Sequence, residues 1–64
     1  MTRNESVDWL LLQARQKKNA SQEQKQRYYD EYKVLLGEIC VGDDDYARKL
    51  YQESLEELGR VLGV

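Results

Sequence analysis

The 64-residue chain has no histidine, no proline and no phenylalanine, and its only cysteine is Cys40. Without histidine the commonest general acid–base group is missing, and one cysteine cannot supply the ligands of a typical zinc site. A lone cysteine also excludes a disulfide within the chain and fits a reducing compartment, so we expect a cytoplasmic protein. These absences indicate a protein that is not an enzyme and that needs neither a metal nor a cofactor.

Long apolar runs are absent as well. No segment approaches the roughly 18 apolar residues of a membrane-spanning helix, and the polar residues 1–6 lead into an apolar run too short for a signal peptide. The acidic run 43–45 lacks the spacing of a calcium-binding EF-hand loop, because Ala47 falls where an oxygen ligand is required. Neither a glycine-rich phosphate loop nor a serine-nucleophile elbow occurs. The sequence therefore predicts no membrane contact and no familiar catalytic or calcium site.

Helix-forming residues dominate what is present. Leucine, glutamate, glutamine, lysine and arginine are frequent and β-branched residues are few, which predicts an all-α fold. We expect a single helical domain over residues 1–64, because a chain this short makes one domain at most. Such a chain buries only about 60% of its unfolded surface and is marginally stable alone. Without a disulfide or a metal, self-association is the remaining aid, so we predict a homodimeric helical bundle.

Capping signals predict a first helix over residues 5–18 and a second helix that begins after Ser21. Thr2 and Glu5 have the spacing of a capping box, in which two side chains three residues apart bond each other's backbone N–H groups. Ser21 and Gln24 have the same spacing. Both signals place a helix start where the apolar pattern also begins.

The link around Gly42 is short, so the second and third helices are predicted to form an antiparallel helical hairpin. Gly42 is expected to end the second helix in the left-handed conformation, and the aspartates at 43–45 are expected to cap the third. Gly37 lies inside the second helix, where glycine costs about 1 kcal/mol relative to alanine. We expect another backbone to approach closely there.

One alternative joins the first two helices. Apolar and small residues stay in phase at seven-residue spacing through the supposed break, which would allow one long helix over residues 5–40 followed by one short helix. Its members are Val7, Ala14, Ser21, Tyr28 and Leu35. For the helical hairpin the predicted core comprises Val7, Leu11, Tyr32, Leu35, Ile39, Tyr51, Leu55 and Leu58.

A stretch of about 14 residues resembles part of a known repeat family. Gly42-Asp43, Ala47, Leu50-Tyr51 and Ser54-Leu55 are similar to the second helix of a tetratricopeptide repeat. A solenoid needs about three such repeats, and this chain offers one. The likeness therefore implies a pair of packed helices rather than a repeat protein.

Residues 9–12, Trp-Leu-Leu-Leu, place apolar surface on every side of one helical turn. A small core cannot cover all of it, so part of this surface is predicted to meet another polypeptide. We expect a small regulator, inhibitor or adaptor that binds another protein through an apolar helical face bearing tyrosine and tryptophan. The predicted contact residues are Trp9, Leu10, Leu12, Tyr28 and Tyr29.

The alternative function is binding of RNA or DNA. Residues 15–27 carry five cations against the single carboxylate Glu23, and such a cluster suits phosphate contacts. The candidate residues are Arg15, Lys17, Lys18, Lys25 and Arg27. Against this hypothesis, the whole chain has a net charge of −2 and a pI near 5.0, which disfavours a dedicated nucleic-acid binder.

Overall fold

The computed structural model describes residues 2–64, which form three helices and no strand. Helix α1 spans Arg3–Arg15, α2 spans Gln22–Ile39 and α3 spans Asp45–Leu62. The all-α prediction is confirmed, and a single long helix over residues 5–40 is excluded because residues 16–21 separate α1 from α2.

Side-chain caps begin all three helices. The Thr2 hydroxyl oxygen accepts a hydrogen bond from the Glu5 backbone N–H at 3.1 Å. At the start of α2 the capping box is complete, because Ser21 and Gln24 each accept from the other's backbone N–H. Asp44 caps α3 through the Ala47 N–H at 3.1 Å. Local sequence therefore determines where each helix starts.

The first helix ends earlier than predicted. It stops at Arg15, and the next residues form tight turns. In these turns the backbone N–H groups of Lys17 and Lys18 donate to the carbonyls three residues earlier. Such bonds tighten the last turn of a helix, and Ser21, with extended backbone angles, then sets the start of α2.

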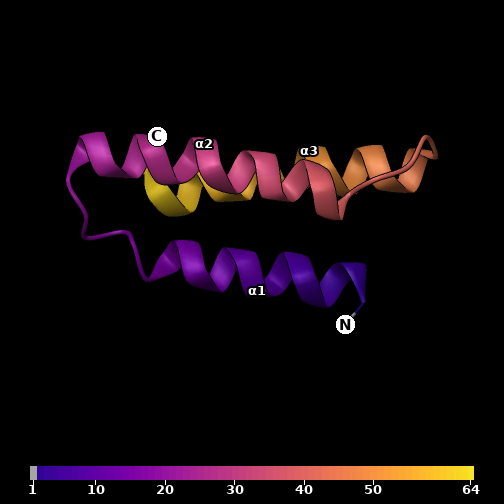
Figure 1. The fold of residues 1–64 in the computed structure, drawn as a ribbon, viewed down its shortest axis with the longest axis horizontal. Helices are drawn as coiled ribbons and strands as arrows, with labels where there is room; N and C mark the ends of the chain where they lie inside the picture. Colours follow the sequence, from indigo (N-terminus) through magenta and orange to yellow (C-terminus); the bar gives the residue numbers. More distant parts are fainter. Residues whose placement is uncertain (1) are drawn as a thin grey trace.

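Figure 1 shows the three helices lying roughly along the long axis of an elongated body, whose dimensions are 36 × 19 × 15 Å. Successive helices run in opposite directions, so the start of α1 lies at the end where α2 connects to α3. Each helix packs against the other two, which leaves one side of every helix facing outward.

The core is small and drawn from all three helices. Its best-buried side chains are Leu10, Leu36, Leu58 and Leu62, and smaller residues fill the spaces between them. The buried apolar set is Val7, Leu10, Ala14, Leu36, Cys40, Ala47, Leu58 and Leu62. Of the predicted core, Val7 and Leu58 are buried, and most of the others pack around the edge.

Three sequence-based expectations are wrong in detail. Leu35 is 42% exposed, because the apolar stripe of α2 is wider than the two neighbouring helices cover. Gly37 meets no close backbone: a Cβ there would have the ring of Tyr51 as its nearest neighbour, at 3.8 Å. Gly42 has a φ of +140°, outside the left-handed helical region, and follows a helix that ends with Cys40 as its cap.

Candidate functional site

The outer face of α1 combines two large apolar side chains with an otherwise polar surface. Val7, Leu10 and Ala14 point into the core. With about 100° of rotation per residue, Trp9 lies roughly 130° and Leu12 roughly 170° away from that direction. The structure agrees, since Trp9 is 52% exposed and Leu12 is 53% exposed.

We define the outer face of α1 as four exposed residues: Glu5, Trp9, Leu12 and Gln16. Their spacings of four, three and four residues place them in one row along the helix. Asp8 and Arg15 are also exposed and lie together on one flank of this row, being seven residues apart. Within residues 2–64, neither Asp8 nor Arg15 forms an ion pair within 4.0 Å; the pairs present are Arg27–Glu23 and Arg60–Glu57.

Leu10 does not belong to a contact surface. It is 1% exposed and packs in the core of the single chain, so its side chain is out of reach of a partner. The prediction that grouped it with Trp9 and Leu12 is corrected by helix geometry, because Leu10 shares the inward side with Val7 and Ala14.

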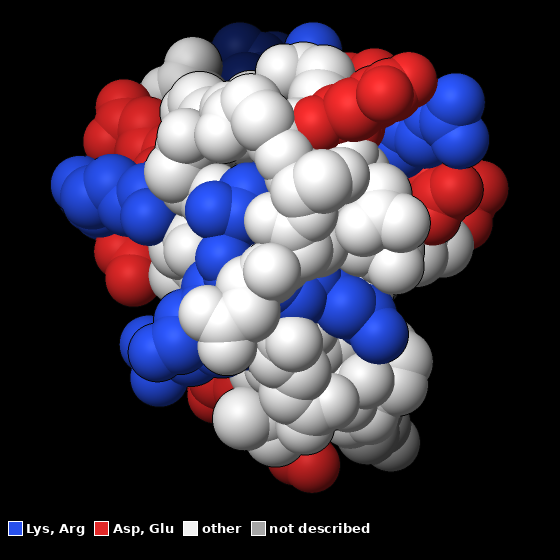
Figure 2. Space-filling model, turned by 90° about the vertical axis from the view of Figure 1, so that its left-hand side faces the viewer, with Lys and Arg blue, Asp and Glu red and all other residues white. Residues whose placement is uncertain are grey.

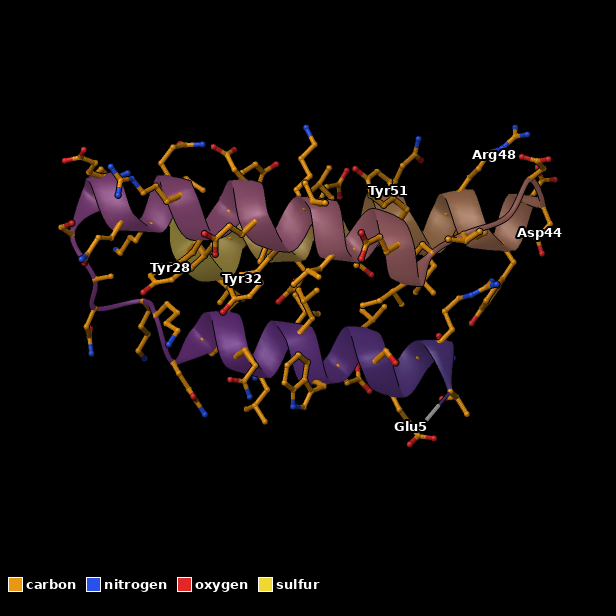
Figure 3. The ribbon with its side chains drawn as sticks, in the orientation of Figure 1. Glu5, Tyr28, Tyr32, Asp44, Arg48 and Tyr51 are labelled. Atoms are coloured by element: carbon orange, nitrogen blue, oxygen red, sulfur yellow. The ribbon has the colours of Figure 1, made fainter. Side chains whose placement is uncertain are left out.

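Tyr28 and Tyr29, the two tyrosines of α2 that were predicted to contact a partner, face different helices. Tyr28 and Tyr32 point from α2 toward α1 (Figure 3), with ring centroids 6.2 Å apart and planes 18° apart. The Lys17 ammonium lies 5.5 Å from the centroid of Tyr28, within the range of a cation–π contact. Tyr28 is therefore half-buried in an intramolecular cluster.

Tyr29 turns toward α3 instead. It lines an open hollow of about 510 Å³ and would lie 3.8 Å from a Cβ at Gly59. The hollow is lined by Tyr29, Leu55, Glu56, Gly59, Arg60, Gly63 and Val64. Nothing in the structure joins Tyr28 and Tyr29 to the outer face of α1 as one surface, and of the predicted contact residues only Trp9 and Leu12 remain together.

The five predicted nucleic-acid contacts lie around the connection between α1 and α2, at one end of the molecule. Figure 2 looks onto this end, where lysine and arginine side chains occur in separate places with carboxylates around the rim. Two cations already have partners: Arg27 lies 3.7 Å from Glu23, and Lys17 lies over Tyr28. The three others, Arg15, Lys18 and Lys25, are unpaired within the part of the chain described.

A second aromatic contact was missed by sequence reasoning. The Tyr46 hydroxyl donates to the Asn4 side-chain oxygen at 2.8 Å, and the Arg3 guanidinium lies 5.9 Å from the Tyr46 ring centroid. Arg3 also donates to the Val41 carbonyl at 3.1 Å. These contacts tie the start of α1 to the connection between α2 and α3. No local signal could reveal them, because the partners are about 40 residues apart in sequence.

Two groups have shifted acidities, the buried Cys40 and the half-buried Tyr32. Burial raises the pKa of the Cys40 thiol, against a smaller opposing effect of Arg3, and the carbonyl-rich end of α2 further disfavours a thiolate. Burial also raises the pKa of Tyr32, with contributions from Tyr28 and Glu31. Both groups are therefore neutral at physiological pH and serve as packing residues.

Residues 2–64 contain no group of three histidine, cysteine or carboxylate side chains arranged to hold a metal ion. None of the helices described is both long and apolar enough to cross a membrane. No known protein family, curated protein or solved structure matches the chain. The outer face of α1 is thus the strongest candidate for a functional surface.

Proposed function

We propose that this chain is a non-catalytic protein-interaction module, a small cytoplasmic regulator or adaptor, which binds a protein partner through the outer face of α1. One observation carries the proposal: Trp9 and Leu12 are both more than half exposed on a helix whose opposite side already fills the core. The single chain leaves about half of each side chain uncovered.

The chemistry of these two residues suits an interface. Tryptophan is among the residues that dominate binding energy at protein interfaces, especially when neighbouring side chains exclude water around it. Here Leu12 lies one turn away from Trp9, and Glu5 and Gln16 extend the row with polar groups at either end. An apolar centre with a polar border is the usual arrangement of a protein-binding surface.

Affinity capture from the native host, with the double variant Trp9→Ala/Leu12→Ala as bait, tests the proposal. Wild-type chain should retain its partner, and the double variant should lose it at a temperature where far-ultraviolet circular dichroism shows both chains folded. Val34→Ala is the matched control, because Val34 is 63% exposed on α2 and lies outside the proposed surface. Equal capture by wild type and double variant would refute the proposal.

The second candidate is binding of RNA or DNA through Arg15, Lys17, Lys18, Lys25 and Arg27. It is favoured by the position of all five cations at one end of the molecule, and opposed by the carboxylates beside them (Figure 2). Each phosphate contact adds close to one unit to the slope of log affinity against log salt concentration. Nucleic-acid binding that weakens steeply with salt, and that Lys18→Glu/Lys25→Glu abolishes, would support this function in place of the first.

A further inference from the structure

We infer that the partner on the outer face of α1 is a second copy of this chain, with the two α1 helices packed antiparallel about a twofold axis. This inference rests on the proposed function, since it names the occupant of the same surface. It is carried by the order of charges along α1, where Glu5 in the row and Asp8 on its flank lie near the beginning and Arg15 lies on the same flank at the end.

The charge order makes the surface complementary to itself. If the twofold axis passes between Trp9 and Leu12, each residue of one copy lies opposite the residue of the other copy for which the two residue numbers add up to 21. Trp9 then packs on the partner's Leu12, and Glu5 lies opposite the partner's Gln16. Arg15 falls opposite position 6 of the other copy, within about 3 Å along the axis of both Glu5 and Asp8.

Flank geometry agrees with this pairing. In an antiparallel helix pair each flank meets the same flank of the other copy. Arg15 and Asp8 share a flank, so Arg15 of each copy lies near Asp8 of the other. The contact therefore brings one cation toward two carboxylates at each end. A parallel pair would instead bring this flank against the opposite flank of the other copy, where Ser6 and Gln13 carry no charge.

The other surfaces do not have this property. On α2 the exposed apolar residues Val34 and Leu35 point about 100° apart around the helix, and the hollow beside Tyr29 carries no pattern that selects one occupant. A helix of 13 residues is about 20 Å long, so pairing through α1 alone buries less than the about 800 Å² per partner of a standard interface. We therefore expect a weak and reversible dimer.

Disulfide trapping tests the orientation. Glu5→Cys and Gln16→Cys are made in separate chains in which the buried Cys40 is replaced by alanine. The antiparallel pair brings these two positions together, so a mixture of the two chains should cross-link under mild oxidation, whereas each chain alone should not. Cross-linking of each chain with itself would indicate a parallel pair and overturn the inference.

Sedimentation equilibrium over about 5 μM to 1 mM covers the range in which weak dimers dissociate, and it tests the energetics. Trp9→Ala/Leu12→Ala should weaken the dimer at least about tenfold. Arg15→Glu should weaken it about threefold to tenfold, while Arg15→Lys and Val34→Ala should change it less than about threefold. Mixing Arg15→Glu with a Glu5→Lys/Asp8→Lys chain should restore association, because opposite charges again meet.

The two proposals fail in different ways. A chain that remains monomeric up to about 1 mM, yet captures a host protein through Trp9 and Leu12, would refute the dimer and leave the proposed function intact. A chain that neither self-associates nor captures a protein through these residues would refute both. A dimer unaffected by Trp9→Ala/Leu12→Ala would show that association uses another surface and would also overturn the inference.

Discussion

Leu10 and Leu12 are chemically identical, lie two residues apart in α1 and should respond very differently to truncation. Leu10 is 1% exposed and Leu12 is 53% exposed. Replacing a fully buried leucine by alanine costs about 2–5 kcal/mol, because both the transfer energy and the packing around the cavity are lost. Complete burial of a leucine contributes about 1.5–3 kcal/mol, so Leu12, covered over about half of its surface, contributes roughly 1 kcal/mol to the fold of one chain.

These magnitudes matter against the total stability. A domain of 64 residues is stable by about 3–10 kcal/mol, so Leu10→Ala removes a large part of that stability and Leu12→Ala a small part. For a domain of this size 1 kcal/mol corresponds to roughly 4–8 °C in the midpoint of thermal unfolding. We expect Leu10→Ala to be largely unfolded or to melt at least about 10 °C below wild type, and Leu12→Ala to melt roughly 4–8 °C below it.

Urea and thermal unfolding followed by far-ultraviolet circular dichroism measure both variants. The concentration should be low and equal for all samples, since any association of the folded chain adds to its apparent stability. Measuring association completes the test, because Leu12→Ala should weaken the dimer although it destabilises the fold much less than Leu10→Ala does. Equal destabilisation by the two substitutions would refute the assignment of Leu12 to an outward surface.

Four further outcomes follow from single residues. Gly37→Ala should stabilise the fold by about 0.5–1 kcal/mol in urea unfolding, because the nearest atom to the new Cβ is 3.8 Å away on Tyr51; destabilisation would indicate a close contact there. Ser21→Ala should cost about 1 kcal/mol by loss of the capping box, with Ser21→Asp as the control that keeps a cap. Burial raises the pKa of Tyr32 above its ordinary 10.0. The stability that the neutral Tyr32 hydroxyl contributes is therefore complete below pH 10 and is lost as pH rises through the folded-state pKa. Tyr32→Phe should lessen that alkaline loss of stability, and an unchanged pH profile would contradict this. Burial likewise raises the pKa of the Cys40 thiol, so an aromatic disulfide reagent near pH 8 should modify the native chain far more slowly than the chain in urea.

Caps in the sequence locate the helix starts closely, although α1 begins at Arg3 rather than at residue 5. The seven-residue apolar spacing leaves open whether three helices form or one long helix replaces the first two. Thr2, Ser21 and Asp44 each act on a backbone N–H three residues away, and no distant part of the chain is needed to recognise them. Helix ends are less determined. The end of α1 at Arg15 depends on turn geometry in residues 16–19, where the residues are still compatible with helix.

The division between core and surface is only partly local. Helical spacing puts Val7, Leu10 and Ala14 on one side of α1, the side that faces the core, but it cannot say how much of a wide apolar stripe the other helices will cover. Leu35 is exposed for this reason, and Tyr28 and Tyr29 separate because one turns toward α1 and the other toward α3. The bond between Tyr46 and Asn4 depends on tertiary arrangement alone.

The fluorescence of Trp9, the only tryptophan in the chain, reports on the proposed binding surface most directly. In dilute solution the indole should emit as a solvent-exposed group and be quenched readily by acrylamide. As the concentration of the chain rises, or as a captured partner is added, the emission should move to shorter wavelength and quenching should fall. An indole protected from quencher in the dilute monomer, or an emission that stays unchanged when a partner is bound, would contradict the account.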